Sequence, residues 1–404
     1  MKVLFVSQYF YPEIFRGNDI VFDLVEKGHE VTVLTGKPNY PLGVFFEGYS
    51  FWGIKKEIIN GANVIRIPTF PRGKGRILSL FLNYLSFFLF SYPYTKFKLD
   101  VNFDIIFVQQ LSPVTMALPG IWAKKRNPNA KLYIWILDLW PESITAVTGL
   151  KTKFIISFIE KLVKYIYSKA DYILISSNFF KESIQQRSKN KKIIYFPNWA
   201  ESIYELSTNL SFNSPTLPYG FNIMFAGNIG EAQDFDTILK ATELTQNDNI
   251  NWIIVGDGRK LNWVRKQVKL RNLKNVHILG RYPIEKMPAF FKKADVMLLT
   301  LKNSPVFNLT VPAKLQAYLA SGKIILGAIN GEANSIINNN DIGMSCESGN
   351  FIKLAENAMF LKNLSKEKRI EMECKSKNLY LQNYSKSVLL NNLELSFKNS
   401  CNIE

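Results

Sequence analysis

The hydrophobic positions in the first half of the chain form short, nearly continuous runs, and longer amphipathic segments separate them. A run that is apolar throughout is typical of a parallel strand buried on both faces, and an amphipathic segment is typical of a helix that covers such a sheet. The chain therefore begins as a series of βα units. The predicted strands are residues 2–7, 30–35, 63–67, 104–108, 132–137, 171–176 and 193–195, and the predicted helices include residues 17–27, 113–125 and 153–169.

The alternation stops at residues 196–199 and restarts after a segment rich in Ser, Asn and Pro. This composition is typical of an interdomain linker. The simplest interpretation is two doubly wound α/β domains that face a cleft, because such sheets bind ligands at the carboxyl ends of their strands. We expect an N-terminal domain over residues 1–200, joined by a C-terminal helix over 384–404, and a second domain over 201–383. The predicted strands of the second domain are residues 222–226, 251–255, 276–279, 295–300 and 323–327, followed by helices over 365–382 and 385–397.

Composition excludes several classes of protein. Of the 404 residues, 47% are apolar and 21% are charged, which excludes a disordered or fibrous chain. Three Cys residues without a C-x-x-C pair and only two His residues argue against a disulfide framework and a metal centre, so we expect no bound metal. The formal net charge of +17 favours anionic partners such as nucleic acid, acidic lipid or phosphate-bearing substrates. Because the positive charge is scattered rather than gathered in a stripe, nucleic acid is the least favoured of these.

Residues 77–95 carry no charged side chain, and Lys74 and Arg76 precede them while Lys96 and Lys98 follow. A transmembrane helix needs about 20 apolar residues, whereas Ser, Asn and Pro interrupt this segment. We expect a crossover helix whose exposed apolar face docks on an anionic membrane, and an ordinary core helix is the alternative. The first residues predict a strand rather than a signal peptide, so we expect a cytoplasmic protein peripherally associated with the inner membrane.

Glycine-rich turns follow the first two predicted strands of the second domain: Gly227-Asn228-Ile229-Gly230 and Gly256-Asp257-Gly258. Glycines let backbone N–H groups approach an anion closely, although any tight βα turn also uses glycine. Further along, Pro312 opens a helix with Lys314 in its first turn. Free amides and an ammonium group there suit a diphosphate held without a metal ion. A surface loop with a solvated lysine is the alternative.

Two polar clusters follow strands of the first domain. The first βα loop ends in Arg16-Gly17-Asn18-Asp19, which either binds a phosphate or hydroxyl-rich ligand or caps the helix that follows. This loop lacks G-x-G-x-x-G, which argues against a nicotinamide or flavin cofactor. Asp138 and Glu142 follow a later strand, where a carboxylate can bind a substrate hydroxyl or act as a base. Trp140 offers a flat platform for a sugar, and helix capping by Glu142 is the alternative for that residue.

Taken together, these segments resemble glycosyltransferase family four, and most closely the bacterial O-antigen and capsule transferases of the N-acetyl-L-fucosamine transferase type. The resemblance spans nearly the whole chain. The residues that carry it are 1–7, Tyr11-Pro12-Glu13, 28–36, Pro38-Asn39-Tyr40-Pro41, 138–143, Pro197-Asn198-Trp199, 227–230, 256–258, Gly280-Arg281 and 311–322.

The resemblance implies a GT-B fold of two Rossmann-like domains, a UDP-linked sugar donor, retention at the anomeric carbon, and neither a metal nor another cofactor. It implies an acceptor linked to polyprenyl diphosphate, in O-antigen or capsular polysaccharide synthesis. The transferred sugar would be N-acetyl-L-fucosamine or a related deoxy amino sugar. The implied donor-binding residues are Gly227, Asn228, Gly230, Gly256, Arg281, Tyr282, Thr310, Val311 and Lys314; the implied acceptor-binding residues are Glu13, Arg16, Asn18, Asp19 and Trp140; the implied catalytic residues are Asp138 and Glu142.

The chain departs from the family pattern at two places. Leu309 and Ala317 stand where most members carry paired glutamates, and residues 227–233 lack the Arg and Lys common in that loop. Lys314 and backbone amides are therefore expected to hold the charge of the leaving group. The rival interpretations are a UDP-N-acetylglucosamine epimerase of the same fold and a basic nucleic-acid-binding protein.

Overall fold

The computed structural model describes residues 1–75, 77–148, 152–205 and 216–402. The chain divides into two compact units, which are described here one at a time. The first unit comprises Met1–Pro197 and Leu389–Glu404, and the second comprises Asn198–Val388. The expected linker falls largely on residues 206–215, outside the described part of the chain.

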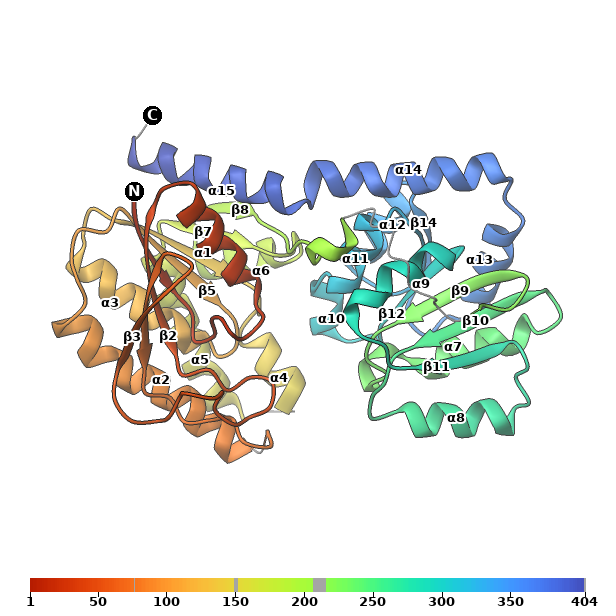
Figure 1. Ribbon diagram of the computed structural model, residues 1–404, viewed down its shortest axis with the longest axis horizontal. Coiled ribbons are helices and arrows are strands. Elements are labelled where there is room, and N and C mark those ends of the chain that lie inside the picture. The colour runs from red at the N-terminus through yellow and green to blue at the C-terminus, as the bar shows by residue number, and fades with distance from the viewer. Residues whose placement is uncertain (76, 149–151, 206–215, 403–404) are drawn as a thin grey trace. The chain divides into compact units, whose positions relative to one another are not determined.

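The first unit is built on an eight-stranded sheet, in the order β3-β4-β2-β1-β5-β6-β7-β8 (Figure 1). Every pairing is parallel except that of β3 with β4. The central strands are almost completely buried, as their apolar sequences predict. The strands are β1 (Lys2–Val6), β2 (Glu30–Gly36), β3 (Lys55–Ile59), β4 (Ala62–Ile67), β5 (Ile105–Gln110), β6 (Lys131–Ile136), β7 (Tyr172–Ile175) and β8 (Lys192–Tyr195).

The helices of the first unit cover this sheet, and the last helix of the chain is one of them. Phe397 of that helix packs against the rings of Tyr133 and Phe107, at centroid distances of 4.8 and 5.9 Å. The end of the chain therefore belongs to the core of the first unit. The helices are α1 (Arg16–Glu26), α2 (Ile77–Phe97), α3 (Leu118–Arg126), α4 (Glu142–Thr148), α5 (Lys153–Lys169), α6 (Phe180–Arg187) and α15 (Lys386–Cys401).

The second unit is built on a six-stranded, entirely parallel sheet in the order β11-β10-β9-β12-β13-β14. The first strand, β9, lies inside the sheet, so the connections run outward from it on both sides. Ligands of open α/β sheets bind at such a reversal, outside the carboxyl ends of the strands. The strands are β9 (Phe221–Ala226), β10 (Ile250–Val255), β11 (Val276–Gly280), β12 (Val296–Thr300), β13 (Ile324–Ala328) and β14 (Gly343–Cys346).

The helices of the second unit pack on a core that includes Phe225, Phe235, Ile238 and Trp252. Trp252 is 1% exposed, and its Nε1 donates to the hydroxyl of Thr245 at 3.0 Å, so the buried indole N–H has a hydrogen-bond partner. The helices are α7 (Phe235–Leu244), α8 (Leu261–Leu270), α9 (Met287–Lys293), α10 (Pro305–Leu309), α11 (Ala313–Ala320), α12 (Glu332–Asn339), α13 (Phe351–Lys362) and α14 (Lys366–Asn383).

Both units build a largely parallel sheet from strands that alternate with helices along the chain. This arrangement confirms the predicted doubly wound α/β class. The sequence pattern missed β3, a short antiparallel strand at the sheet edge that is not apolar throughout. It also missed β14, a four-residue strand whose middle residues are half-buried. Both strands lie at sheet edges, where a continuous apolar run is not required. No helix among the described residues combines the length and hydrophobicity needed to cross a bilayer.

Candidate functional site

The turns after β9 and β10 interlock at the carboxyl edge of the second sheet. Gly227 and Gly256 have φ angles of 133° and 147°, which residues with a side chain rarely adopt. A Cβ on Gly256 would lie 1.9 Å from the carbonyl oxygen of Gly227, so the two turns are in direct backbone contact. Gly227 and Asn228 are exposed at this edge, while Ile229 is buried and anchors the turn. The result is a rigid, accessible backbone surface.

Lys314 reaches the underside of the same turn from α11. A Cβ on Gly227 would lie only 2.7 Å from Lys314 Cε. The ammonium nitrogen is shielded from solvent and has no hydrogen-bond partner among the described residues. It lies 3.6 Å from the centroid of the Phe225 ring, a favourable but weak contact. Burial lowers the pKa of Lys314 to about 7, because the charged form loses its hydration.

A hydrogen-bonded tyrosine fixes α11 in this position. Tyr318, one turn after Lys314, directs its hydroxyl to the carbonyl oxygens of Ala226 on β9 and Leu298 on β12, at 3.5 and 3.4 Å. The helix is therefore attached to the two strands that flank the reversal of the sheet. Its N-terminus, capped by Pro312 in extended backbone, begins beside them.

The other predicted donor residues occupy the loops around this edge. Asn228 lies between Gly230 and Gly258, since a Cβ on either would meet its amide within 2.7 Å. Arg281 follows β11 and is exposed. Three other predicted donor residues have different surroundings. Tyr282 packs against Phe290 with tilted rings whose centroids lie 4.7 Å apart. Thr310 follows the last residue of α10 and donates its hydroxyl to Phe307 O at 3.3 Å, and Val311 is half-buried.

Sequence reasoning missed a group of three charged residues at the same edge. Glu231 Oε2 lies 3.2 Å from Lys260 Nζ and 3.4 Å from Lys302 Nζ. The three residues come from loops after β9, β10 and β12. Each lysine follows a strand closely, which is a weak signal in the sequence, and only the order of the strands shows that both meet Glu231.

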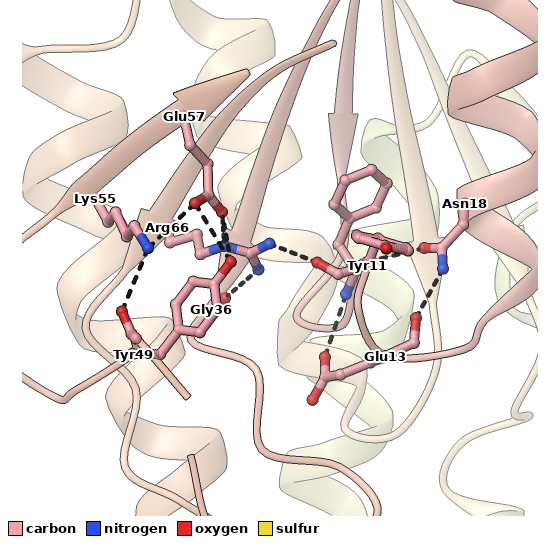
Figure 2. A network of polar contacts seen from close by, with 10 residues as sticks. Tyr11, Glu13, Asn18, Gly36, Tyr49, Lys55, Glu57 and Arg66 are labelled. Atoms are coloured by element: carbon pink, nitrogen blue, oxygen red, sulfur yellow. Dashed lines mark hydrogen bonds and ion pairs between the residues drawn. The ribbon is translucent and has the colours of Figure 1, made fainter. Parts of the chain in front are cut away.

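In the first unit, Glu13 is 1% exposed, and backbone amides donate to its carboxylate; Figure 2 draws one of these contacts. Its Oε1 accepts from the amides of Asn39 and Tyr40 at 2.8 and 2.7 Å, and its Oε2 accepts from Phe10 at 3.3 Å. Burial raises the pKa of Glu13 to about 7, while these amides act in the opposite direction. Glu13 thus joins the loop after β1 to the loop after β2.

The buried guanidinium of Arg66 supports the same loop from β4 (Figure 2). It donates to the carbonyl oxygens of Tyr11 and, at 3.4 Å, Gly36, and it forms an ion pair with Glu57 on β3. Asn18 completes the loop: its amide donates to Glu13 O at 2.7 Å and accepts from Tyr11 N at 3.1 Å. The predicted acceptor residues Arg16 and Asp19 lie half-buried in the first turn of α1.

Asp138 and Trp140 are both attached to Ser112, which follows β5. Asp138 Oδ2 accepts from the amide of Ser112 at 2.8 Å, and Trp140 Nε1 donates to the hydroxyl of Ser112 at 3.0 Å. Asp138 is half-buried at the carboxyl end of β6, as predicted. Trp140 is only 8% exposed, so the expectation of an open platform for a sugar is wrong in this conformation: its ring packs into the unit.

Glu142 forms an ion pair through one carboxylate oxygen, and its predicted role as a base stays a prediction. Arg187 Nη2 lies 2.9 Å from Glu142 Oε1, and Ser183 donates to the same oxygen at 3.1 Å. The Nε of Arg187 also lies 3.0 Å from Glu160 on α5. Glu142 therefore connects α4 to α6.

Metal binding has no evident ligand set in this structure. The described ranges contain no group of three or more His, Cys, Asp or Glu side chains placed to hold a metal ion. Metal independence remains a prediction for solution experiments.

The sequence was compared with family models and with named proteins. Residues 214–378 match the family model described as Glycosyl transferases group 1. WcaI of Escherichia coli K12, named as a colanic acid biosynthesis glycosyl transferase, is 24% identical over 342 residues, which cover 80% of this chain and 82% of WcaI. WbjE of Pseudomonas aeruginosa, named as a glycosyltransferase, is 25% identical over 232 residues, 55% of this chain and 58% of WbjE.

A solved structure of similar fold is that of Anabaena HepE in complex with UDP and glucose. It has a TM-score of 0.64 and 13% sequence identity, and the alignment covers 99% of this chain and all of that one. At this identity the likeness establishes the fold alone. Residues 214–378 thus resemble the glycosyl transferases group 1 family, and the two named relatives are glycosyltransferases.

Proposed function

We propose that the protein transfers a sugar from a UDP-linked donor to a lipid-linked saccharide in the synthesis of a bacterial surface polysaccharide. The observation that carries the proposal is Lys314: its buried ammonium lies against the glycine turn of residues 227–230 and has no anionic partner in the part of the chain that the structure describes. A buried unpaired ammonium costs stability, so its retention is best explained by a ligand that supplies the negative charge. A solved structure of the same fold contains UDP and glucose.

The proposed chemistry is stabilisation of a departing diphosphate. As the glycosidic bond of the donor breaks, negative charge develops on the oxygen that joins the sugar to the diphosphate. The backbone amide of Asn228, the amides at the start of α11 and the Lys314 ammonium are placed to stabilise that charge, whereas the amides of Gly227, Ile229 and Gly230 donate within the protein. In the first unit, Asp138 orients or deprotonates the acceptor hydroxyl, because its Oδ1 remains outside the hydrogen bond from Ser112 to Oδ2.

Names of relatives support the polysaccharide context. WcaI is named for colanic acid biosynthesis. The resemblance to N-acetyl-L-fucosamine transferases supports a deoxy amino sugar as the transferred group and a polyprenyl diphosphate as the carrier of the acceptor. These finer assignments are part of the proposal.

The exposed apolar side chains of α2 support a peripheral membrane location. On α2 the polar residues Asn83, Ser86 and Ser91 are buried. Asn83 accepts from Gln8 Nε2 at 2.8 Å, and Ser86 accepts from Phe70 N at 2.9 Å. The helix also exposes large apolar side chains along most of its length: Leu78, Phe81, Leu82, Leu89 and Tyr92. Such a surface, next to basic residues and in a chain of net charge +17, suits an anionic bilayer.

The donor assignment is tested by turnover. Purified protein is incubated with a panel of UDP-sugars and a synthetic lipid-diphosphate saccharide, and products are identified by mass and NMR. Lys314→Ala should slow transfer on the order of 100-fold or more, the scale of a lost charge-stabilising group. Lys377→Ala, in the same unit, is the control, because Lys377 donates to the carbonyl oxygen of Ala320 at 2.6 Å, at the opposite end of α11 from Lys314. Normal turnover by Lys314→Ala contradicts the proposal, and conversion of a UDP-sugar without acceptor favours an epimerase.

The membrane assignment is tested by flotation with vesicles of phosphatidylglycerol. Leu78→Asp with Leu89→Asp should weaken binding at least about tenfold, because two exposed leucines are replaced by anions. Leu270→Asp changes a leucine of similar exposure on α8 and serves as the control. Undiminished binding by the double variant would exclude α2 as the docking face.

A further inference from the structure

The carboxylate of Glu231 holds two ammonium groups from different loops close together. A single oxygen, Oε2, receives both Lys260 and Lys302, at 3.2 and 3.4 Å. Two like charges so close to one anion repel each other, and a single carboxylate neutralises only half of their charge. The lysines are thus arranged for an anion with more charge and more oxygens than Glu231 provides.

This group lies at the reversal of the second sheet. Lys302 follows β12, Lys260 follows β10, and Glu231 follows β9 between them. Backbone hydrogen bonds hold the three loops together: Lys302 N donates to Ala232 O at 2.8 Å, and Lys260 N donates to Ile229 O at 3.0 Å. The lysines therefore flank the same 227–230 turn under which Lys314 lies.

Glu231 is held weakly enough to be replaced. Its side chain is 68% exposed, and ion pairs of that exposure contribute little net stability. The hydrogen bond from Lys260 lowers the pKa of the Glu231 carboxyl, so it is anionic at neutral pH. It starts a single 3₁₀ turn, residues Glu231–Gln233, that can rotate the side chain outward without disturbing a long helix.

We propose that Glu231 is a built-in substitute for a donor phosphate: it keeps Lys260 and Lys302 converged in the free enzyme, and the diphosphate displaces it on binding. This inference rests on the proposed function, because the diphosphate is that of the donor. On release of the nucleoside diphosphate the carboxylate returns and competes with it. Lys260 and Lys302 then supply the positive charge that residues 227–233 themselves lack.

The inference makes opposite predictions for the carboxylate and the lysines. Glu231→Gln removes the competing anion while keeping the shape of the side chain, so UDP should bind about threefold to tenfold more tightly. Lys302→Gln removes a phosphate contact, so UDP should bind about tenfold more weakly. Uridine, which has no phosphate, should bind all variants equally.

The test is calorimetric titration of the full chain with UDP and with uridine. Glu243→Gln is the matched control. Glu243 lies on α7 of the same unit, is half-exposed, and pairs with Arg271 at 3.7 Å. Tighter UDP binding by Glu231→Gln alone supports the inference. Unchanged or weaker UDP binding by Glu231→Gln overturns it, and so does an equal change in uridine binding.

Failure of the inference is distinguishable from failure of the proposed function. If Lys314→Ala loses UDP while Glu231→Gln binds it like the unaltered protein, the diphosphate site stands and the substitute anion does not. If the unaltered protein binds no UDP, both fall.

Discussion

At the residue scale, a lysine ammonium without an anion is the most informative feature of the molecule. Lys314 was predicted as a phosphate ligand from its place after Pro312, but its burial came only from the structure. Other residues show the limit of sequence reasoning. Glu142 meets Arg187 across 45 positions of the chain, and no local pattern reveals that pair. Lys260 and Lys302 meet Glu231 only because their strands flank β9.

The lowered pKa of Lys314 predicts proton uptake on donor binding. Because burial lowers this pKa to about 7, the ammonium is mostly deprotonated at about pH 8 in the free protein. A bound diphosphate favours the charged form and raises the pKa, so UDP binding should take up close to one proton at about pH 8 and less at lower pH. Affinity for UDP should therefore fall as pH rises above 7.

Calorimetry in buffers of different ionisation enthalpy measures this uptake. Lys314→Arg is the control, because a guanidinium stays charged and needs no proton. Binding by the unaltered protein with no proton uptake would show that Lys314 is not the group that meets the diphosphate.

At the element scale, the sequence pattern located nearly all the buried parallel strands, because a strand covered on both faces must be apolar throughout. It placed α5 at the residues observed. It did not find β3, whose residues serve a different purpose: Glu57 on β3 balances the buried Arg66 of β4. It predicted α2 as a helix with an exposed apolar face, and the structure adds that Asn83, Ser86 and Ser91 are buried on it together with Phe87 and Tyr94.

The β3–β4 edge should depend on the ion pair that joins it. Arg66→Met removes the guanidinium from the Tyr11 carbonyl and from the Glu57 carboxylate, which keeps only its contacts with Tyr49 and Lys55; this should cost about 3 kcal/mol, as for breaking a largely buried pair. Arg66→Met combined with Glu57→Met should cost clearly less, because the Lys55 ammonium that then loses Glu57 is 40% exposed and stays hydrated. Hydrogen exchange of peptides that cover β3 and β4 reports the local free energy of opening. If the two substitutions instead add, the pair does not support the loop of Glu13.

At the scale of the whole molecule, two units with parallel sheets carry the two halves of the proposed reaction. Each sheet brings its polar loops to the carboxyl edge, a property of the topology that could be inferred from the order of the strands. What could not be inferred is which loop residues are used for architecture. In the first unit Glu13, Asn18 and Trp140 bond to loops of that unit, whereas Lys314 of the second unit has no hydrogen-bond partner among the described residues.

The most direct measurement is a crystal structure of the protein with UDP. We expect a phosphate oxygen within hydrogen-bond distance of Lys314 Nζ, with the glycine turn of residues 227–230 on the other side of the diphosphate. UDP bound in the first unit, or bound in the second with Lys314 still lacking an anion, would contradict the account.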